Sequence, residues 1–86
     1  DTLLRHRDSP NETYTVEVCG SRKGPYSGYD ADVYLIDNKT NTREYINALT
    51  DEQHIYIKWT SETEFYIGMT DYIITNEGVI YQRHQN

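Results

Sequence analysis

The stretch SPNETYTVEV, residues 9–18, shows how this chain begins to fold. Its first four residues predict a turn, because serine, proline and asparagine favour turn conformations. In the residues that follow, Tyr14, Val16 and Val18 alternate with polar side chains. Side chains on a strand point alternately to the two faces of a sheet, so this alternation predicts a strand with one apolar face. The segment is therefore a turn that leads directly into a half-buried strand.

The same alternation recurs along the rest of the chain. Further strands are predicted at residues 30–36, 42–47, 54–59, 64–67, 71–75 and 79–84, with turn residues between them. Residues 48–53 are predicted as a loop with at most one short helical turn, because Thr50 and Gln53 match a capping box. Successive strands lie close in sequence, which favours hairpins. The pattern thus predicts an all-β fold, a small antiparallel sheet of 6–7 strands in a meander that could curl into a sandwich or barrel.

The length of 86 residues predicts a single domain, residues 1–86. The chain begins with Asp1 rather than methionine, so we expect a processed or excised piece in which residues 1–8 are flexible or link to an upstream anchor. Apolar residues on the inward faces of the strands should form the core. These are Tyr14, Val16, Val18, Val33, Leu35, Ile55, Ile57, Trp59, Phe65 and Ile67.

The chain is acidic, with 8 Lys and Arg against 14 Asp and Glu and a net charge of −6. Non-specific binding to nucleic acid or to an anionic membrane needs a basic face. We therefore expect no direct nucleic-acid partner. No apolar run approaches the roughly 18 residues that a membrane helix needs, and contact with a membrane is expected only through an anchor upstream of this chain.

No residue pattern indicates a metal, a cofactor or a catalytic site. Cys19 is the only cysteine, which excludes an internal disulfide and a cysteine-based zinc site. Asp30 and Asp32 share a strand face, but calcium needs six to eight oxygen ligands and usually a loop that wraps the ion. The three histidines are scattered, and no hydrolase or phosphate-binding motif is present. We expect no bound metal, no cofactor and no enzymatic activity.

The glycine-rich segment 20–28 interrupts the strand pattern and leads to the most promising binding residues. Tyr26 and Tyr29 lie in the sequence KGPYSGYD, and exposed loop tyrosines are typical of recognition surfaces. Arg22 and Lys23 form an adjacent basic pair on an otherwise acidic chain. We predict that these four residues bind a protein partner. The alternative is that the two tyrosines fold back over the edge of a sheet.

Three segments together resemble a known family: SPNETYTVEV at 9–18, DADVYLIDNKTN at 30–41 and IYIKWTSETEFYIG at 55–68. Their turns and strands are similar to those of small Gram-positive membrane-anchored proteins of unknown function. The first strand of that family is commonly entered through Ser-Pro-Asp-Gly-x-Tyr, where this chain has Asn11-Glu12 instead of Asp-Gly. A similar entry also opens β-propeller blades, but 86 residues could hold at most two of the four blades required.

Two hypotheses for function follow. The resemblance implies an extracytoplasmic, cell-envelope location with an anchor missing from this chain, and the tyrosine-bearing loop favours a non-enzymatic binding module. The net charge and small size favour a different class, an acidic inhibitor or immunity-type protein that acts on a nuclease or a nucleic-acid-binding protein. Basic residues interrupt the acidic ones along the later strands, which favours the binding module.

Overall fold

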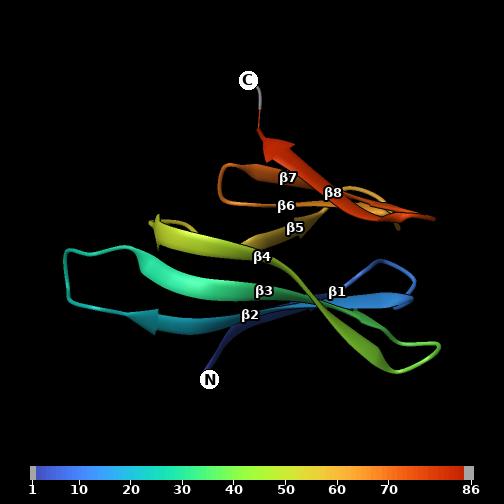
Figure 1. Ribbon diagram of the computed structural model, residues 1–86, viewed down its shortest axis with the longest axis horizontal. Coiled ribbons are helices and arrows are strands. Elements are labelled where there is room, and N and C mark those ends of the chain that lie inside the picture. Colours follow the sequence, from blue (N-terminus) through green and yellow to red (C-terminus); the bar gives the residue numbers. More distant parts are fainter. Residues whose placement is uncertain (1, 85–86) are drawn as a thin grey trace.

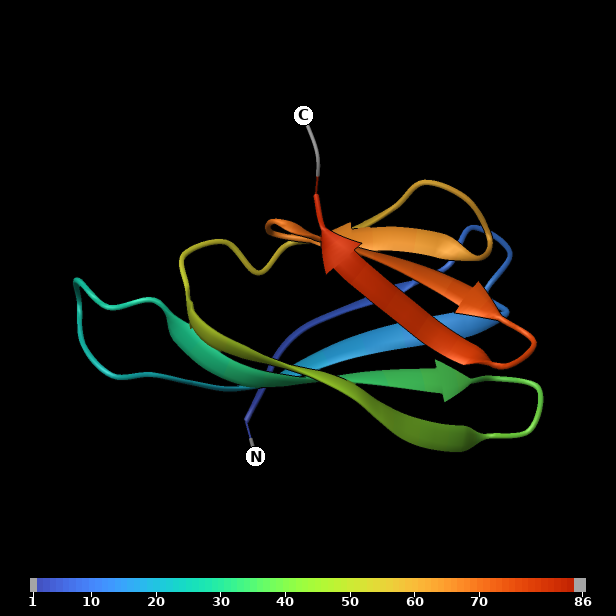
Figure 2. The same cartoon turned by 45° about the horizontal axis from the view of Figure 1, so that its top comes forward.

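The protein is all-β, as the alternation predicts. The computed structural model describes residues 2–84 and contains strands joined by turns and loops, with no helix in that part of the chain. The strands are β1 (Leu3–Asp8), β2 (Tyr14–Arg22), β3 (Tyr29–Asp37), β4 (Thr42–Glu52), β5 (Ile57–Trp59), β6 (Glu64–Ile67), β7 (Thr70–Thr75) and β8 (Gly78–Arg83). Figures 1 and 2 show their arrangement.

The strands form two antiparallel sheets of four, with the orders β1-β2-β3-β4 and β5-β6-β7-β8. Each sheet is a meander, because every strand pairs with its neighbour in the sequence. Figure 1 shows the two sheets as separate layers, with the second above the first. They do not close into a barrel, and the edge strands β1 and β5 lie next to each other.

The core lies between the two sheets. Eight of the ten predicted core residues are buried: Val16, Val18, Val33, Leu35, Ile55, Ile57, Phe65 and Ile67. The other two, Tyr14 and Trp59, are only partly buried and pack against the edge of this cluster. The fall in exposed apolar area on folding is what holds the two layers together.

Three further residues of the core cluster were outside the predicted set. Ala31, Leu49 and Tyr72 are buried. Leu49 lies in a segment predicted as a loop, and Tyr72 stands in a strand whose apolar residues do not alternate. The buried hydroxyl of Tyr72 accepts a 3.0 Å hydrogen bond from Nδ2 of Asn47, which satisfies its polar tip.

The structure differs from the predictions about local structure at several places. Residues 3–8, expected to be flexible or to link to an upstream anchor, form strand β1, paired with β2. Residues 54–56, predicted as the start of a strand, precede β5, which begins at Ile57. Residues 48–52 belong to β4, because β3 extends back to Tyr29 and pairs with this part of the chain across a bulge. Long-range pairing therefore overrides the local capping-box pattern, and the total is eight strands rather than six or seven.

The SPNE turn, residues 9–12, connects β1 to β2 as its sequence suggests. The N–H of Ser9 donates to the carbonyl of Tyr14 at 2.8 Å, and the N–H of Glu12 donates to the carbonyl of Ser9 at 2.8 Å. Glu12 has a φ of 60°, a left-handed backbone conformation that residues other than glycine rarely adopt. Ser9 is the one buried polar residue among those described.

Candidate functional site

The predicted binding residues all lie at the loop between β2 and β3. This loop extends beyond the second sheet at the left of Figures 1 and 2. Tyr26 is 97% exposed, more than any other large hydrophobic side chain of the described residues. Its ring is available to a partner, and its removal should not disturb the core.

Arg22 fixes the loop from within. Its Nε donates to the carbonyl of Ser27 at 3.0 Å, and its Nη2 donates to the carbonyl of Pro25 at 2.6 Å. The guanidinium also lies 5.5 Å from the ring centre of Tyr29, within range of a cation–π contact. These bonds hold the two sides of the loop together around Tyr26.

Lys23 and Tyr29 have different surroundings. The ammonium of Lys23 pairs with Asp30 at 3.3 Å, and 78% of the Lys23 side chain remains exposed. Tyr29 begins β3, is half-buried and packs against the core cluster. Tyr29 therefore has a structural role at the base of the loop. The predicted alternative, a tyrosine folded over the sheet, describes Tyr29 but not Tyr26.

Hydrogen bonds to β4 fix the end of the loop that leads into β3. The N–H of Gly28 donates to Oδ1 of Asp51 at 2.8 Å, and the N–H of Asp51 donates to Oδ1 of Asp30 at 2.9 Å. A Cβ at position 28 would collide with the backbone of Asp51, so only glycine fits there. The backbone bond from Asp51, helped by Lys23, lowers the pKa of Asp30.

The carboxylates considered as calcium ligands do not converge. Asp30 already accepts the N–H of Asp51 and pairs with Lys23. Asp32 stands opposite Ala48 on β4. Residues 2–84 contain no group of three or more His, Cys, Asp or Glu placed to hold a metal ion. They also contain no helix long and apolar enough to cross a membrane.

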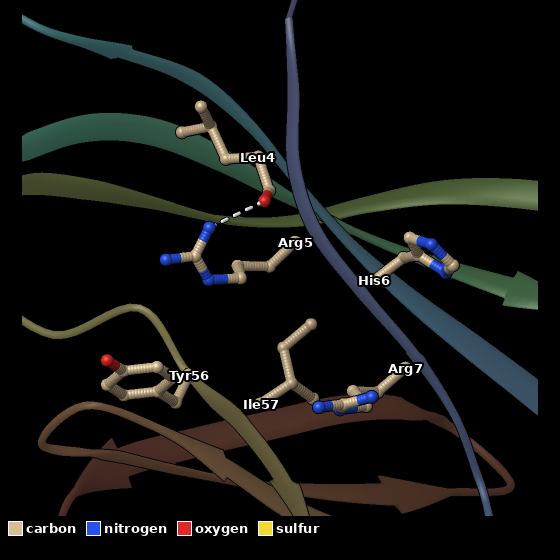
Figure 3. A pocket seen from close by; sticks show the side chains of 6 residues that line it. All are labelled: Leu4, Arg5, His6, Arg7, Tyr56 and Ile57. Atoms are coloured by element: carbon tan, nitrogen blue, oxygen red, sulfur yellow. Dashed lines mark hydrogen bonds between the residues drawn. The ribbon is translucent and has the colours of Figure 1, made fainter.

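Figure 3 shows a recess between the edge strands β1 and β5 that no pattern in the sequence indicates. It has a volume of about 330 Å³ and is lined by Leu4, Arg5, His6, Arg7, Tyr56 and Ile57. The guanidinium of Arg5 lies 5.6 Å from the ring centre of Tyr56, which is 67% exposed. The recess therefore combines two cationic side chains with an aromatic ring.

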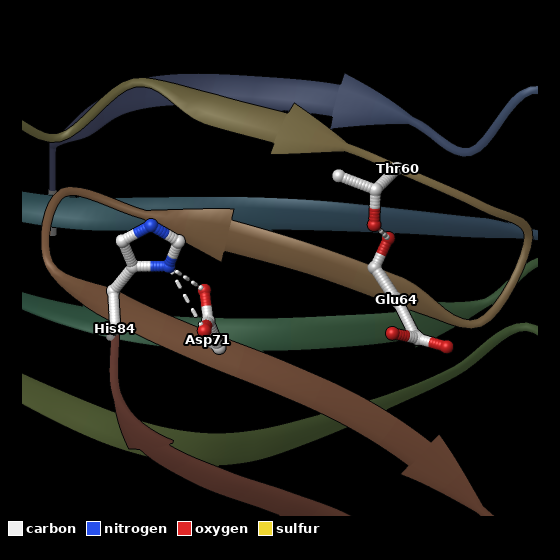
Figure 4. Close-up of polar contacts among 4 residues, drawn as sticks. All are labelled: Thr60, Glu64, Asp71 and His84. Atoms are coloured by element: carbon white, nitrogen blue, oxygen red, sulfur yellow. Dashed lines mark hydrogen bonds and ion pairs between the residues drawn. The ribbon is translucent and has the colours of Figure 1, made fainter. Parts of the chain in front are cut away.

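A carboxylate–imidazole pair lies on the second sheet (Figure 4). Nδ1 of His84 is 2.8 Å from Oδ1 of Asp71, and both side chains are about one-third exposed. A carboxylate can orient a catalytic histidine in this way, but the Thr60 hydroxyl nearby donates instead to the carbonyl of Glu64. Within residues 2–84 no nucleophile is hydrogen-bonded to His84. The pair was missed in the sequence because its two residues are thirteen positions apart and meet only across a hairpin.

Two comparisons with known proteins, among curated sequences and among solved structures, give no match. A third does: the model of a family of unknown function, DUF5412, matches residues 1–85. The chain is therefore an all-β, two-sheet domain that belongs to the DUF5412 family.

Proposed function

We propose that this domain is a non-enzymatic binding module that presents the β2–β3 loop to a protein partner. The observation that carries the proposal is the 97% exposure of Tyr26 on a loop whose base is fixed. Arg22 holds the loop from within, and Gly28 joins it to β4. A loop that is ordered before binding loses less conformational entropy when the partner arrives. Tyrosine adds a large contact area with few rotatable bonds.

We further propose that the module works outside the cytoplasm in the cell envelope, attached through an anchor upstream of this chain. The support for this location is the resemblance in the turn and strand motifs. In that pattern a glycine stands at the position of Glu12, and Glu12 has the positive φ that glycine favours. The turn geometry is thus compatible with the pattern even though the residue differs.

The alternative function, an acidic inhibitor that mimics a nucleic-acid backbone, has less support. Such a mimic needs free carboxylates along one face. Glu17 is instead paired with Arg43 at 3.1 Å, and Asp30 is paired with Lys23 at 3.3 Å. Partners of opposite charge reduce the potential that a basic nucleic-acid-binding surface would detect.

The experiment compares Tyr26→Ala with Tyr45→Ala, a matched control that removes an exposed tyrosine from β4. Each immobilised variant is incubated with cell-envelope proteins, and retained proteins are quantified by mass spectrometry. A candidate retained by the wild type and by Tyr45→Ala is then purified and titrated. We expect Tyr26→Ala to weaken its binding by about 2 kcal/mol, a factor of roughly 30, with an unchanged melting temperature. Equal binding by all three proteins would refute a role for the loop.

A further inference from the structure

The recess between β1 and β5 has features that the proposed function does not use. β1 is the outermost strand of the first sheet, so the outward N–H and C=O groups of β1 have no neighbouring strand. Nε1 of Trp59 in β5 donates to the carbonyl of Arg7 at 3.2 Å. The two sheets are joined at this end of β1.

The backbone groups of His6 are among those that point outward. In an antiparallel pair, successive residues alternate between pointing toward the partner strand and away from it. The N–H of Ser9 donates to the carbonyl of Tyr14, so Ser9 points toward β2. The register is regular from there to Arg5, so Arg7 and Arg5 also point toward β2 and His6 points away. Figure 3 shows β1 moving away from β5 toward its N-terminal end. The edge is therefore open beside His6.

The side chains at this edge are basic. Arg5 and Arg7 stand opposite Val18 and Val16, whose side chains are buried in the core, so both arginines lie on the inner face of the sheet. Figure 3 shows them on the side of β1 that faces Tyr56 and Ile57. No carboxylate within residues 2–84 forms an ion pair with either arginine, whereas Arg43 and Lys23 are both paired.

We propose that the open edge of β1 binds a short, extended acidic segment of a partner protein, which adds as a strand beside His6. Its backbone would pair with the N–H and C=O of His6, and the carboxylates on either side of that pair would meet the guanidinium groups of Arg5 and Arg7. The site is distinct from the β2–β3 loop.

The charges at this edge favour an acidic protein segment over a second copy of the chain, nucleic acid or a membrane. A second copy of the chain paired edge to edge would bring its own Arg5 and Arg7 against the first pair, and like charges opposite each other are destabilising. Nucleic acid and anionic membranes would meet a molecule of net charge −6 with only two cations in the recess. An acidic segment of a few residues avoids both conflicts.

The probe is a fluorescein-labelled peptide, acetyl-EVEVEV-amide, titrated into the 86-residue protein. Its lysine counterpart KVKVKV tests charge. EVEPEV, with proline in place of the central valine, keeps the charge but loses a backbone donor. We expect saturable binding of EVEVEV that weakens with added salt, at least tenfold weaker binding of EVEPEV, and none of KVKVKV. Equal binding of EVEVEV and EVEPEV would overturn strand addition.

Matched variants locate the site. Arg5→Gln with Arg7→Gln should weaken EVEVEV binding at least tenfold, whereas Lys39→Gln with Arg83→Gln removes the same charge from exposed positions elsewhere and should change it little. In the wild type, hydrogen exchange of the His6 amide should slow on binding. That of Arg5, which faces β2, should not change. An unchanged His6 amide, or equal loss in both double variants, would refute the site.

The β1 edge should bind independently of the β2–β3 loop and should select an acidic protein segment. Tyr26→Ala should bind EVEVEV as the wild type does, so failure of the loop proposal and failure of this one are distinguishable. Single-stranded DNA and vesicles containing phosphatidylserine should not bind. Binding of either that depends on Arg5 and Arg7 would overturn the assignment to an acidic protein segment.

Discussion

The hydroxyl of Ser9 donates a 2.5 Å hydrogen bond to Oε2 of Glu62, a residue 53 positions away in the chain. Glu62 lies in the turn between β5 and β6, and its carboxylate also accepts the N–H groups of Asn11 at 2.8 Å and Thr13 at 3.2 Å. One side chain thus holds the β1–β2 turn against the second sheet. These bonds, that of Ser9 most strongly, lower the pKa of Glu62.

Replacing Glu62 by Gln should make the protein less stable at neutral pH and less sensitive to acid. The pKa of Glu62 is lower in the folded protein than its ordinary value of 4.5. Its contribution to stability is therefore complete above that value and is lost as the pH falls through the lower folded pKa. Thermal melts between about pH 7 and pH 3 should show the gap between wild type and variant closing below about pH 4.5.

Glu64→Gln is the control, because Glu64 is exposed and two positions away. It should leave the pH profile almost unchanged. Asp30, whose pKa is also lowered, remains in all three proteins and should keep some acid sensitivity in each. A gap for Glu62→Gln that stays constant down to about pH 3 would contradict a role for its ionised carboxylate.

Replacing Glu12 by Gly should stabilise the protein. Glu12 has a φ of 60°, and a left-handed conformation costs a residue with a Cβ roughly 1 kcal/mol more than glycine. Part of this gain is offset by the greater entropy of glycine in the unfolded chain, so we expect about 0.5 kcal/mol from urea unfolding. Asn41, with a φ of 59°, is the comparison. Asparagine tolerates this conformation, so Asn41→Gly should gain less. A loss of stability in Glu12→Gly would contradict this prediction.

Replacing Tyr72 by Phe should remove an alkaline instability. Burial raises the pKa of Tyr72 from 10.0 to about 12, despite the hydrogen bond from Asn47. The contribution of the protonated Tyr72 hydroxyl to the free energy of unfolding is complete below pH 10. It is lost as the pH rises to about 12, a change of up to roughly 3 kcal/mol. At neutral pH the variant should lose about 1 kcal/mol with the hydrogen bond. Urea unfolding followed by circular dichroism at several pH values measures both effects, and identical alkaline profiles would contradict the prediction.

Truncation of Phe65 should cost more than truncation of Trp59. The sequence pattern places both in the core, but Phe65 is 2% exposed and stacks on Tyr72, whereas Trp59 is partly buried beside it. We expect Phe65→Ala to lose about 3–5 kcal/mol, enough to unfold much of a domain this small. Trp59→Ala should remain folded with a smaller loss. Chemical denaturation of the two variants gives the order, and the reverse order would refute this description of the core.

Most strands and the inner face of the domain follow from local patterns in the sequence. Val16, Val18 and Val33 are buried because alternation with period two must place them on one face, wherever the strand pairs. The β3–β4 hairpin and the closing β7–β8 hairpin follow from turn residues at positions 38–41 and 76–77. The loop that carries Tyr26 could also be predicted, since its glycines and proline interrupt the pattern.

Features that depend on the meeting of distant segments could not be predicted in this way. Local patterns do not encode which partner a strand has, so β1 and the end of β4 were not predicted as strands. The same reason separates Tyr26 from Tyr29, which share a loop in sequence but differ in exposure because only Tyr29 lies against β4 and the core. The bond from Ser9 to Glu62 and the recess beside Arg5 exist only because two sheets, folded from different parts of the chain, pack against each other.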